Sequence, residues 1–376
     1  MIAKPDHQRG AWGNKQSTLC AILLLTLTGI VVGMAGCQSP PTKSVTPEKP
    51  KEIAQLPPPH FVGSEDCRGC HPKIAQDHEV TGHARTMRLA DKAHLLEQYP
   101  KAGKTGSFEY VVNEEQGILQ LALQSSPLSK IPLAYAFGAG KNALTFLCPY
   151  EDDKLVELRM SYHPKLKEWF ITPGQVEKMK GAELGLVWES AMSKRCVHCH
   201  TTTQDPKELI PEDKFFGVGC ETCHGAGSNH VEVMRQTNKS PYYIDKKAHL
   251  GGKEMNDMCG DCHRRTQDVM ETDKGMTQRF QPYGLALSKC FKNSNNELTC
   301  VTCHNPHQNA STNHPQYNKV CLSCHTTNVT PPAKLSKVVV CPKQPQGNCV
   351  NCHMPLKALR KKYGNILIQM ADHYIR

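Results

Sequence analysis

Short segments of the form Cys-x-x-Cys-His recur along the chain and are its most informative chemical feature. The first is Cys67-Arg68-Gly69-Cys70-His71. Two cysteines three positions apart can form thioethers with the two vinyl groups of a porphyrin, and the histidine that follows can then bind the iron. The pattern is therefore the attachment signature of c-type haem.

The same pattern occurs seven times and defines the attachment sites residue by residue. The predicted thioether cysteines are Cys67, Cys70, Cys196, Cys199, Cys220, Cys223, Cys259, Cys262, Cys300, Cys303, Cys321, Cys324, Cys349 and Cys352. The predicted proximal iron ligands are His71, His200, His224, His263, His304, His325 and His353. The sequence thus predicts seven haem c groups, numbered 1 to 7 in chain order.

Two other uses of CxxC pairs fit the sequence less well. Zinc sites need no histidine directly after each pair, so seven such histidines would be unexplained. Disulfides within the pairs, or thioredoxin-like redox centres, leave the same histidines unexplained and lack a βαβ context. Covalent haem is therefore the preferred interpretation.

Histidines outside the motifs are candidates for the sixth, or distal, iron ligand. The chain has 19 histidines, and eleven remain after the proximal seven and His7 are set aside. The favoured distal ligands are His83, His230, His307 and His373, followed by His78, His249 and His314. His307 lies three residues after His304, so we expect it to bind a neighbouring haem rather than its own.

The remaining candidates have other expected roles. Surface or packing positions are predicted for His60, His94, His163 and His198. A methionine can replace a distal histidine and raises the potential of its haem, and the candidates for this are Met192, Met258 and Met354.

The N-terminus has the pattern of a secretory signal. Lys4, Arg9 and Lys15 precede an apolar run, Leu19–Gly36, that ends in Met34-Ala35-Gly36-Cys37. This ending resembles a bacterial lipoprotein box with Cys37 as the lipidated residue, although Met34 stands where leucine is usual. The alternative is an uncleaved membrane anchor, because eighteen residues can just span a bilayer. Either reading predicts an exported protein in the periplasm or at the outer membrane surface.

Composition and motif spacing divide the chain into six segments. The predicted segments are a signal peptide (1–36), a Pro- and Lys-rich tether (37–59), a haem 1 module (60–100), a haem-free insert (101–175), haems 2–4 (176–270) and haems 5–7 (271–376). From motif 2 onward the first cysteines are 24, 39, 41, 21 and 28 residues apart, which leaves room for one helix or loop per haem. Adjacent porphyrins should therefore lie close together.

The predicted fold is a multihaem cytochrome c, mainly α and irregular around stacked haems, with a small antiparallel β insert. Helices are expected within Pro72–Tyr99 and over Gln175–Lys194. Strands are expected at Phe108–Val112, Ile118–Leu123, Leu144–Leu147 and Leu155–Met160, with turns at Asn113–Gly117 and Glu151–Lys154.

Composition and charge agree with a cofactor-filled interior. Aromatic residues make up only 6% of the chain, so the porphyrins themselves should form much of the core. The formal charge is +10, of which residues 1–36 contribute +3 and −1, leaving +8. A bis-histidine ferric haem with both propionates ionised carries about −1, so seven bring the protein near neutrality. The basic residues are therefore expected to pair with propionates, and no nucleic-acid partner is expected.

Three cysteines lie outside the motifs and outside residues 1–37. In an exported chain the preferred disulfide is Cys290–Cys341, because both cysteines flank the last three motifs. Cys148 lies in a predicted apolar strand and is expected to be a buried thiol.

The segments flanking several motifs resemble one bacterial family. They are Gly63–Cys67 with Thr81–Ala84, Gly217–Cys220 with Gly227–His230, Leu298–Cys300 with Asn305–His307, and Cys352–Pro355 with Asp372-His373. They are similar to exported multihaem c-type cytochromes with doubled CxxCH modules, related to tetrahaem cytochromes of ammonia oxidisers and distantly to the nitrite reductase and hydroxylamine oxidoreductase lineage. The resemblance covers most of 60–100 and 190–376, and it implies that His83, His230, His307 and His373 are distal ligands.

The expected function is electron transfer between redox partner proteins, one of them a membrane quinol-oxidising complex, through mostly bis-histidine haems. The alternative is a reductase of nitrite, hydroxylamine or a similar small oxyanion at one open haem. Enzymes of that lineage use a lysine proximal ligand or a crosslinking tyrosine at the reactive haem, whereas all seven motifs here end in histidine. A third possibility is that the β insert is a docking module for a partner.

Overall fold

The computed structural model describes residues 56–90, 102–105, 108–175, 182–203, 207–236, 242–295, 297–325, 341, 348–358 and 368–376. The predicted signal peptide, the predicted lipid attachment residue Cys37 and His94 lie outside these described residues. Gln55–Arg376 form one compact unit. Among the described helices, none combines the length and the apolar character needed to cross a bilayer.

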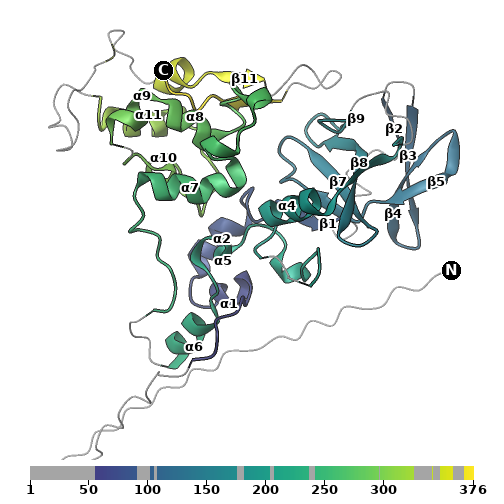
Figure 1. Cartoon of the computed structure of the whole chain (residues 1–376), viewed down its shortest axis with the longest axis horizontal. Helices are drawn as coiled ribbons and strands as arrows, with labels where there is room; N and C mark the ends of the chain where they lie inside the picture. Colours follow the sequence, from purple (N-terminus) through teal and green to yellow (C-terminus); the bar gives the residue numbers. More distant parts are fainter. Residues whose placement is uncertain are drawn as a thin grey trace, which may run out of the picture. The chain divides into compact units, whose positions relative to one another are not determined.

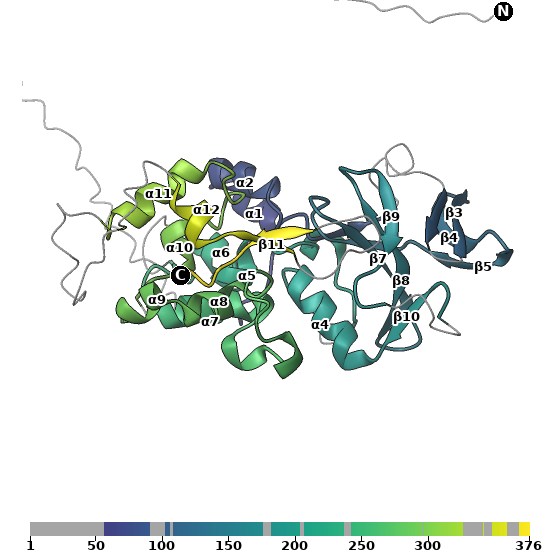
Figure 2. The same ribbon diagram turned by 90° about the horizontal axis from the view of Figure 1, so that it is seen from above.

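Two antiparallel sheets occupy the middle of the sequence (Figures 1 and 2). Their strands are β1 (Met87–Leu89), β2 (Ala102–Thr105), β3 (Phe108–Glu115), β4 (Ile118–Leu123), β5 (Ser126–Pro132), β6 (Tyr135–Phe137), β7 (Leu144–Tyr150), β8 (Lys154–His163), β9 (Glu168–Ile171) and β10 (Gly185–Trp188). One sheet has the order β2-β3-β4-β5, and the other has the order β1-β6-β7-β8-β10, with β9 paired to β8.

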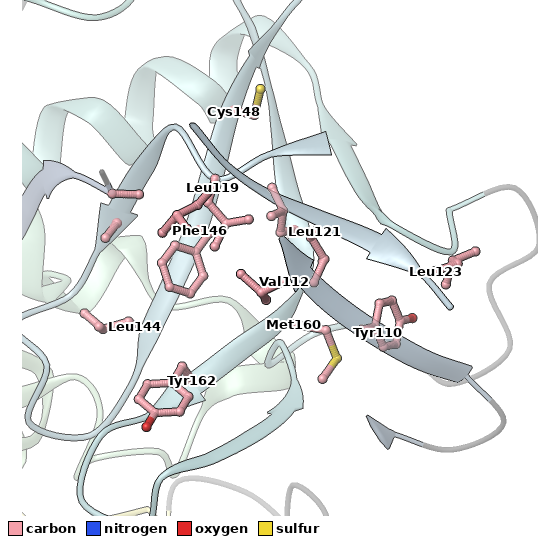
Figure 3. Close-up of a cluster of buried hydrophobic side chains, with 14 residues drawn as sticks. Tyr110, Val112, Leu119, Leu121, Leu123, Leu144, Phe146, Cys148, Met160 and Tyr162 are labelled. Atoms are coloured by element: carbon pink, nitrogen blue, oxygen red, sulfur yellow. The ribbon is translucent and has the colours of Figure 1, made fainter. Parts of the chain in front are cut away.

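The two sheets share one apolar core, which Figure 3 shows. Leu119, Leu121 and Leu123 alternate along β4, as expected for a strand with one buried face. They belong to the same cluster as Phe146 of β7 and Tyr162 of β8. This part of the chain is therefore held together by ordinary side-chain packing.

The described helices are short, and most carry or follow a CxxCH motif (Figure 1). They are α1 (Ser64–Arg68), α2 (Pro72–Glu79), α4 (Ser190–His200), α5 (Cys220–His224), α6 (Ser228–Gln236), α7 (Gly252–His263), α8 (Gln281–Leu287), α9 (Lys289–Asn293), α10 (Cys300–Cys303), α11 (His314–Leu322) and α12 (Cys349–His353). A two-stranded sheet of β11 (Leu356–Ala358) and β12 (Gln369–Ala371) follows.

The four predicted strands are confirmed as parts of β3, β4, β7 and β8, but two helix predictions were too long. Pro72–Tyr99 contains α2, yet Met87–Leu89 is strand β1, because it pairs with β6. Gln175–Lys194 contains strand β10, which pairs with β8. A Cβ atom at Gly185 would lie 2.6 Å from the Glu157 carbonyl oxygen, so a glycine is needed for this close pairing.

Of the two predictions about the cysteines outside the motifs, one is confirmed and the other is wrong. Cys148 is a buried free thiol in β7, as predicted. Cys290 and Cys341 are also free thiols, in contrast to the predicted disulfide. Cys290 instead lies near the motif cysteines, where Cys324 contributes to raising its pKa after the larger effect of burial.

A buried carboxylate anchors the C-terminal segment. The Asp372 side chain is fully buried, and it accepts hydrogen bonds from the Thr277 hydroxyl and, at 3.0 Å, the Tyr374 amide. Its other oxygen lies 2.7 Å from Lys357 Nζ and 3.2 Å from an Arg376 guanidinium nitrogen. Burial alone would raise the pKa of Asp372, but the Lys357 and Thr277 hydrogen bonds outweigh it and hold the pKa below 3.8.

The core predicts a large effect of truncation at Phe146, which has no exposed surface. Phe146→Ala should lower the free energy of unfolding by about 3–5 kcal/mol, because it removes buried apolar area and leaves a cavity. The matched control is Leu128→Ala, since Leu128 is 94% exposed and its truncation should cost less than about 0.5 kcal/mol. Urea denaturation followed by circular dichroism measures both, and equal effects would contradict this core.

The ion pairs of Asp372 predict a pH-dependent stability. A carboxyl whose folded pKa is lowered contributes stability above its ordinary pKa and loses it as the pH falls through the folded value. Asp372→Asn should therefore cost about 1–3 kcal/mol at pH 7 and progressively less below pH 3.8. Melting temperatures of both proteins between pH 2.5 and about 7 test this, and a gap that does not change with pH would contradict it.

Candidate haem-attachment sites

The local fold of the motifs places their reactive groups on one side. α4, α5, α7 and α12 each end at a motif histidine, namely His200, His224, His263 and His353. In a helix, residues at positions i, i+3 and i+4 share one face. The two cysteines and the histidine of such a motif therefore point in the same direction, which is the arrangement that attachment to one porphyrin requires.

These faces line one large cavity. Its volume is about 2750 Å³, whereas an ordinary small-molecule site has roughly 300–1,000 Å³. Every motif contributes to the lining, through Cys67, Cys199, Cys220, Cys259, Cys300, Cys321 and Cys349. The residues fit several haem groups, because thiols and imidazoles converge on a shared space that side chains leave open.

Four motif histidines face a second histidine across this space. The ring centroids are 6.3 Å apart for His71 and His230, 6.0 Å for His83 and His263, 6.1 Å for His224 and His307, and 6.3 Å for His304 and His373. Metal–imidazole bonds are about 2 Å long, so rings on opposite sides of one iron have centroids roughly 6 Å apart. All four separations match this value.

Hydrogen bonds fix which ring nitrogen is available. The Nδ1 atoms of three of these histidines lie near backbone carbonyl oxygens: His224 to Asp245 at 2.7 Å, His230 to Tyr242 at 2.6 Å and His373 to Ala371 at 3.0 Å. The same holds for His200 of motif 2, whose Nδ1 lies 2.9 Å from the Thr86 carbonyl oxygen. When Nδ1–H donates to a carbonyl, Nε2 is left as the unprotonated atom that can bind a metal.

Burial keeps two of the distal candidates in the neutral, metal-binding form. Burial, with a smaller effect of neighbouring His263, lowers the pKa of His83 to about 4. Burial also lowers the pKa of His373 to about 4, although its hydrogen bond to Ala371 opposes the shift. Both imidazoles are therefore uncharged at neutral pH.

Motif 2 has a different environment. The ring contact of His200 among the described residues is with Phe137, at a centroid distance of 4.8 Å and an interplanar angle of 51°. Val197, inside the motif, is fully buried in a cluster with Met87 and Phe137. Motif 2 thus packs into a second apolar cluster, formed with residues of strands β1, β6, β7 and β8.

Thiols of different motifs also contact one another. Cys67 lies close enough to Cys220, Cys199 to Cys262, Cys259 to Cys300, and Cys321 to Cys349 for one thiol to shift the pKa of the other. Cys223 and Cys303 in turn lie close enough to Cys259 and Cys321, respectively, for one thiolate to raise the pKa of the other thiol. The motifs therefore form a continuous succession, 1–3–4–5–6–7, with motif 2 beside motif 4.

The other candidate residues vary in position. His78, His314, Met258 and Met354 line the cavity. His249 is 68% exposed and lies 3.9 Å from an Asp245 carboxylate oxygen. His60 is exposed, His163 is buried in β8, and Met192 is 41% exposed.

His198 forms a 2.5 Å contact with Asp261. Together with Cys262, these two residues are close enough to hold a metal ion. The group is largely exposed and shares its thiol with motif 4, so it belongs to the haem-attachment region rather than to a separate metal site.

Sequence reasoning missed two buried carboxylates in this region, Glu221 and Asp372. Glu221 lies between the cysteines of motif 3 and is 2% exposed. Asp372 precedes His373 and has no exposed surface. The available signal was their position beside predicted haem ligands.

Comparisons with known proteins agree with the motifs. The family model for cytochrome c554 and c-prime matches residues 163–225, and the model for the doubled CXXCH motif matches residues 293–330. The multiheme cytochrome MtrA of Shewanella baltica (strain OS185) is 25% identical over 199 residues, covering 49% of this chain and 53% of the relative. The chain thus spans about half the length of that relative.

The fold also resembles a solved structure. The crystal structure of the outer cell wall cytochrome OcwA matches with a TM-score of 0.50 and 15% sequence identity, covering 84% of this chain and 79% of that chain. The motif matches and this fold together support the assignment of the chain as a multihaem c-type cytochrome.

Proposed function

We propose that this chain transfers electrons through seven covalently attached haems, most of them with two histidine ligands. The observation that carries the proposal is the set of four imidazole pairs with centroids 6.0–6.3 Å apart. Haem supplies the one-electron redox chemistry when it is bound. An iron with two histidine ligands has no open position for a substrate, which favours electron transfer over catalysis at these four sites.

The pairs support one particular distal ligand for each of four motifs. His230 would serve motif 1, His307 motif 3, His83 motif 4 and His373 motif 5. This agrees with the expectation that His307 binds a haem other than that of His304. The succession of thiol contacts supports the role, because closely spaced attachment sites allow electrons to cross the protein.

The setting of the protein is part of the same proposal. We infer export by the N-terminal signal, lipid attachment at Cys37 in the periplasm or at the outer membrane surface, and redox protein partners that include a membrane quinol-oxidising complex. The motif-flanking segments further suggest a relation to the tetrahaem cytochromes of ammonia oxidisers and, distantly, to the nitrite reductase and hydroxylamine oxidoreductase lineage.

A second candidate function is supported by the surroundings of motif 2. Among the described residues, the ring contact of His200 is with Phe137 and not with a histidine. A haem there without a second protein ligand could bind nitrite, hydroxylamine or a similar small oxyanion. This candidate is a reductase that receives electrons from the other six sites.

One set of measurements tests the proposal and separates the two candidates. The full chain, produced in a host that attaches c-type haem, should gain the mass of seven haems, and paramagnetic resonance of the oxidised protein should give mainly low-spin signals. A protein at its bare polypeptide mass would refute the proposal. One high-spin iron that binds cyanide or nitric oxide would support the reductase, whereas high-spin signals from most irons would contradict electron transfer as the main role.

The ligand assignment predicts the effect of removing one distal histidine. His307→Ala should convert one low-spin haem to high-spin and leave the number of attached haems unchanged, because the thioethers of motif 3 remain. The matched control is His249→Ala, whose side chain is 68% exposed and has no facing motif histidine among the described residues. A resonance spectrum of His307→Ala identical to that of the unaltered protein would contradict the assignment.

A further inference from the structure

Glu221 lies inside motif 3, yet its carboxylate binds backbone amides in the two segments that lead to the proposed ligands of haem 1. One oxygen accepts hydrogen bonds from the Val62 amide at 3.0 Å and the Gly227 amide at 2.7 Å. The other accepts from the Gly63 amide at 2.8 Å and from Val62 at 3.2 Å. The side chain is only 2% exposed, so these backbone donors replace water around it.

The backbone around Glu221 is shaped for a carboxylate. Gly63 has a φ of +96°, which a residue with a side chain rarely adopts. A Cβ atom at Gly227 would lie 3.1 Å from a Glu221 oxygen. Two glycines thus allow backbone N–H groups to converge on the carboxylate, which is a common way to bind an anion.

These contacts join the two ligand-bearing segments of haem 1. Val62 and Gly63 immediately precede α1, which leads into the motif that ends at His71. Gly227 immediately precedes α6, which carries His230. One buried group therefore fixes both the proximal and the distal side of the same site, and it does so from between the cysteines of motif 3.

Glu221 differs from Asp372 in its charge balance. Asp372 has Lys357 and Arg376 beside it. The hydrogen-bond partners of Glu221 among the described residues are all neutral amides, and every one of them is a donor. These amides replace the water around the carboxylate but bring no positive charge that would cancel its own. A buried charge also acts over a longer distance than an exposed one, because less water screens it.

We propose that Glu221 is a positioning residue that holds the segments carrying His71 and His230, the proposed ligands of haem 1, and places a fixed negative charge beside motifs 1 and 3, where it would lower the reduction potentials of the haems attached there. Reduction adds negative charge to a haem, so a nearby carboxylate disfavours it. The inference rests on the proposed attachment of haems at motifs 1 and 3.

The test compares two Glu-to-Gln variants of the full chain with its haems attached, one at Glu221 and one at a control position. Glu221→Gln keeps the shape of the side chain and removes its charge. We expect two of the one-electron transitions to move to higher potential, each by about a tenfold change in equilibrium constant, or about 59 mV. The matched control is Glu65→Gln in α1, next to motif 1, where the side chain is 82% exposed and the potentials should stay unchanged.

The outcomes separate this inference from the function on which it rests. If the unaltered protein carried no haem at motif 1 or motif 3, the proposed function would be refuted. Full haem content in Glu221→Gln with unchanged potentials would overturn the role of Glu221, as would equal shifts in both variants.

If Glu221→Gln does not accumulate, Glu221→Asp provides a second reading. The shorter side chain cannot reach all three amides, so the resonance signal of one low-spin haem should change while the charge remains. An unaltered resonance spectrum in Glu221→Asp would overturn the positioning role.

Discussion

The constraint on which the haem region depends is that, at four of the proposed sites, the two imidazoles come from distant parts of the chain. In the proposed ligation, motif 1 takes its second histidine from α6 after motif 3, and motif 3 takes His307 from the segment after motif 5. Motif 4 takes His83 from the segment after motif 1, and motif 5 takes His373 from the C-terminal segment. These four sites are therefore interlocked, and none of them is complete with the segment around its own motif alone. Each such bond closes a long loop, so haem binding and folding are coupled in the way that cofactor binding stabilises a native state.

Close backbone contacts, independent of any iron, hold a segment that carries a proposed distal histidine in place. Gly217 has a φ of +79°, and a Cβ atom there would lie 2.1 Å from the Ala84 carbonyl oxygen. The Val218 amide donates to the His83 carbonyl oxygen at 2.9 Å. The loop that leads into motif 3 thus packs tightly against the segment that contains His83, the proposed distal ligand of motif 4. Asn309 extends this connection, since its side chain bonds the Val80 carbonyl oxygen and the Gly82 amide.

The attachment motifs and the main strands could be predicted from the sequence because both depend on local spacing. Helical positions i, i+3 and i+4 define CxxCH, and the alternation in Ile118–Leu123 defines β4. The four histidines given by resemblance also lie opposite motif histidines. Which motif each one faces could not be predicted, because that choice is made by tertiary contacts such as those of Gly217. β1 and β10 were missed for a similar reason, since strands of three and four residues exist only through pairing with β6 and β8. Glu221 reads as an ordinary surface charge until Val62 and Gly227 are seen beside it.

The sheets and most of the motif helices are stabilised in different ways, and this difference matters for motif 2. α1, α10 and α12 have no buried residues, so side-chain packing alone gives these motif helices little stability. α4 instead packs on β8: Ser193 is fully buried and accepts a hydrogen bond from the Leu155 amide at 3.0 Å. Val197 of motif 2 is buried in an apolar cluster that includes Leu155. In contrast, Val301 of motif 5 and Leu322 of motif 6 are 41% and 40% exposed. The sheets thus provide a scaffold that fixes motif 2 without a second histidine, while motifs 1, 3, 4 and 5 rely on ligands exchanged between motifs. A site held by protein packing can leave one face of its iron open at little cost in stability, and this is the physical reason for singling out motif 2 as the candidate reactive site.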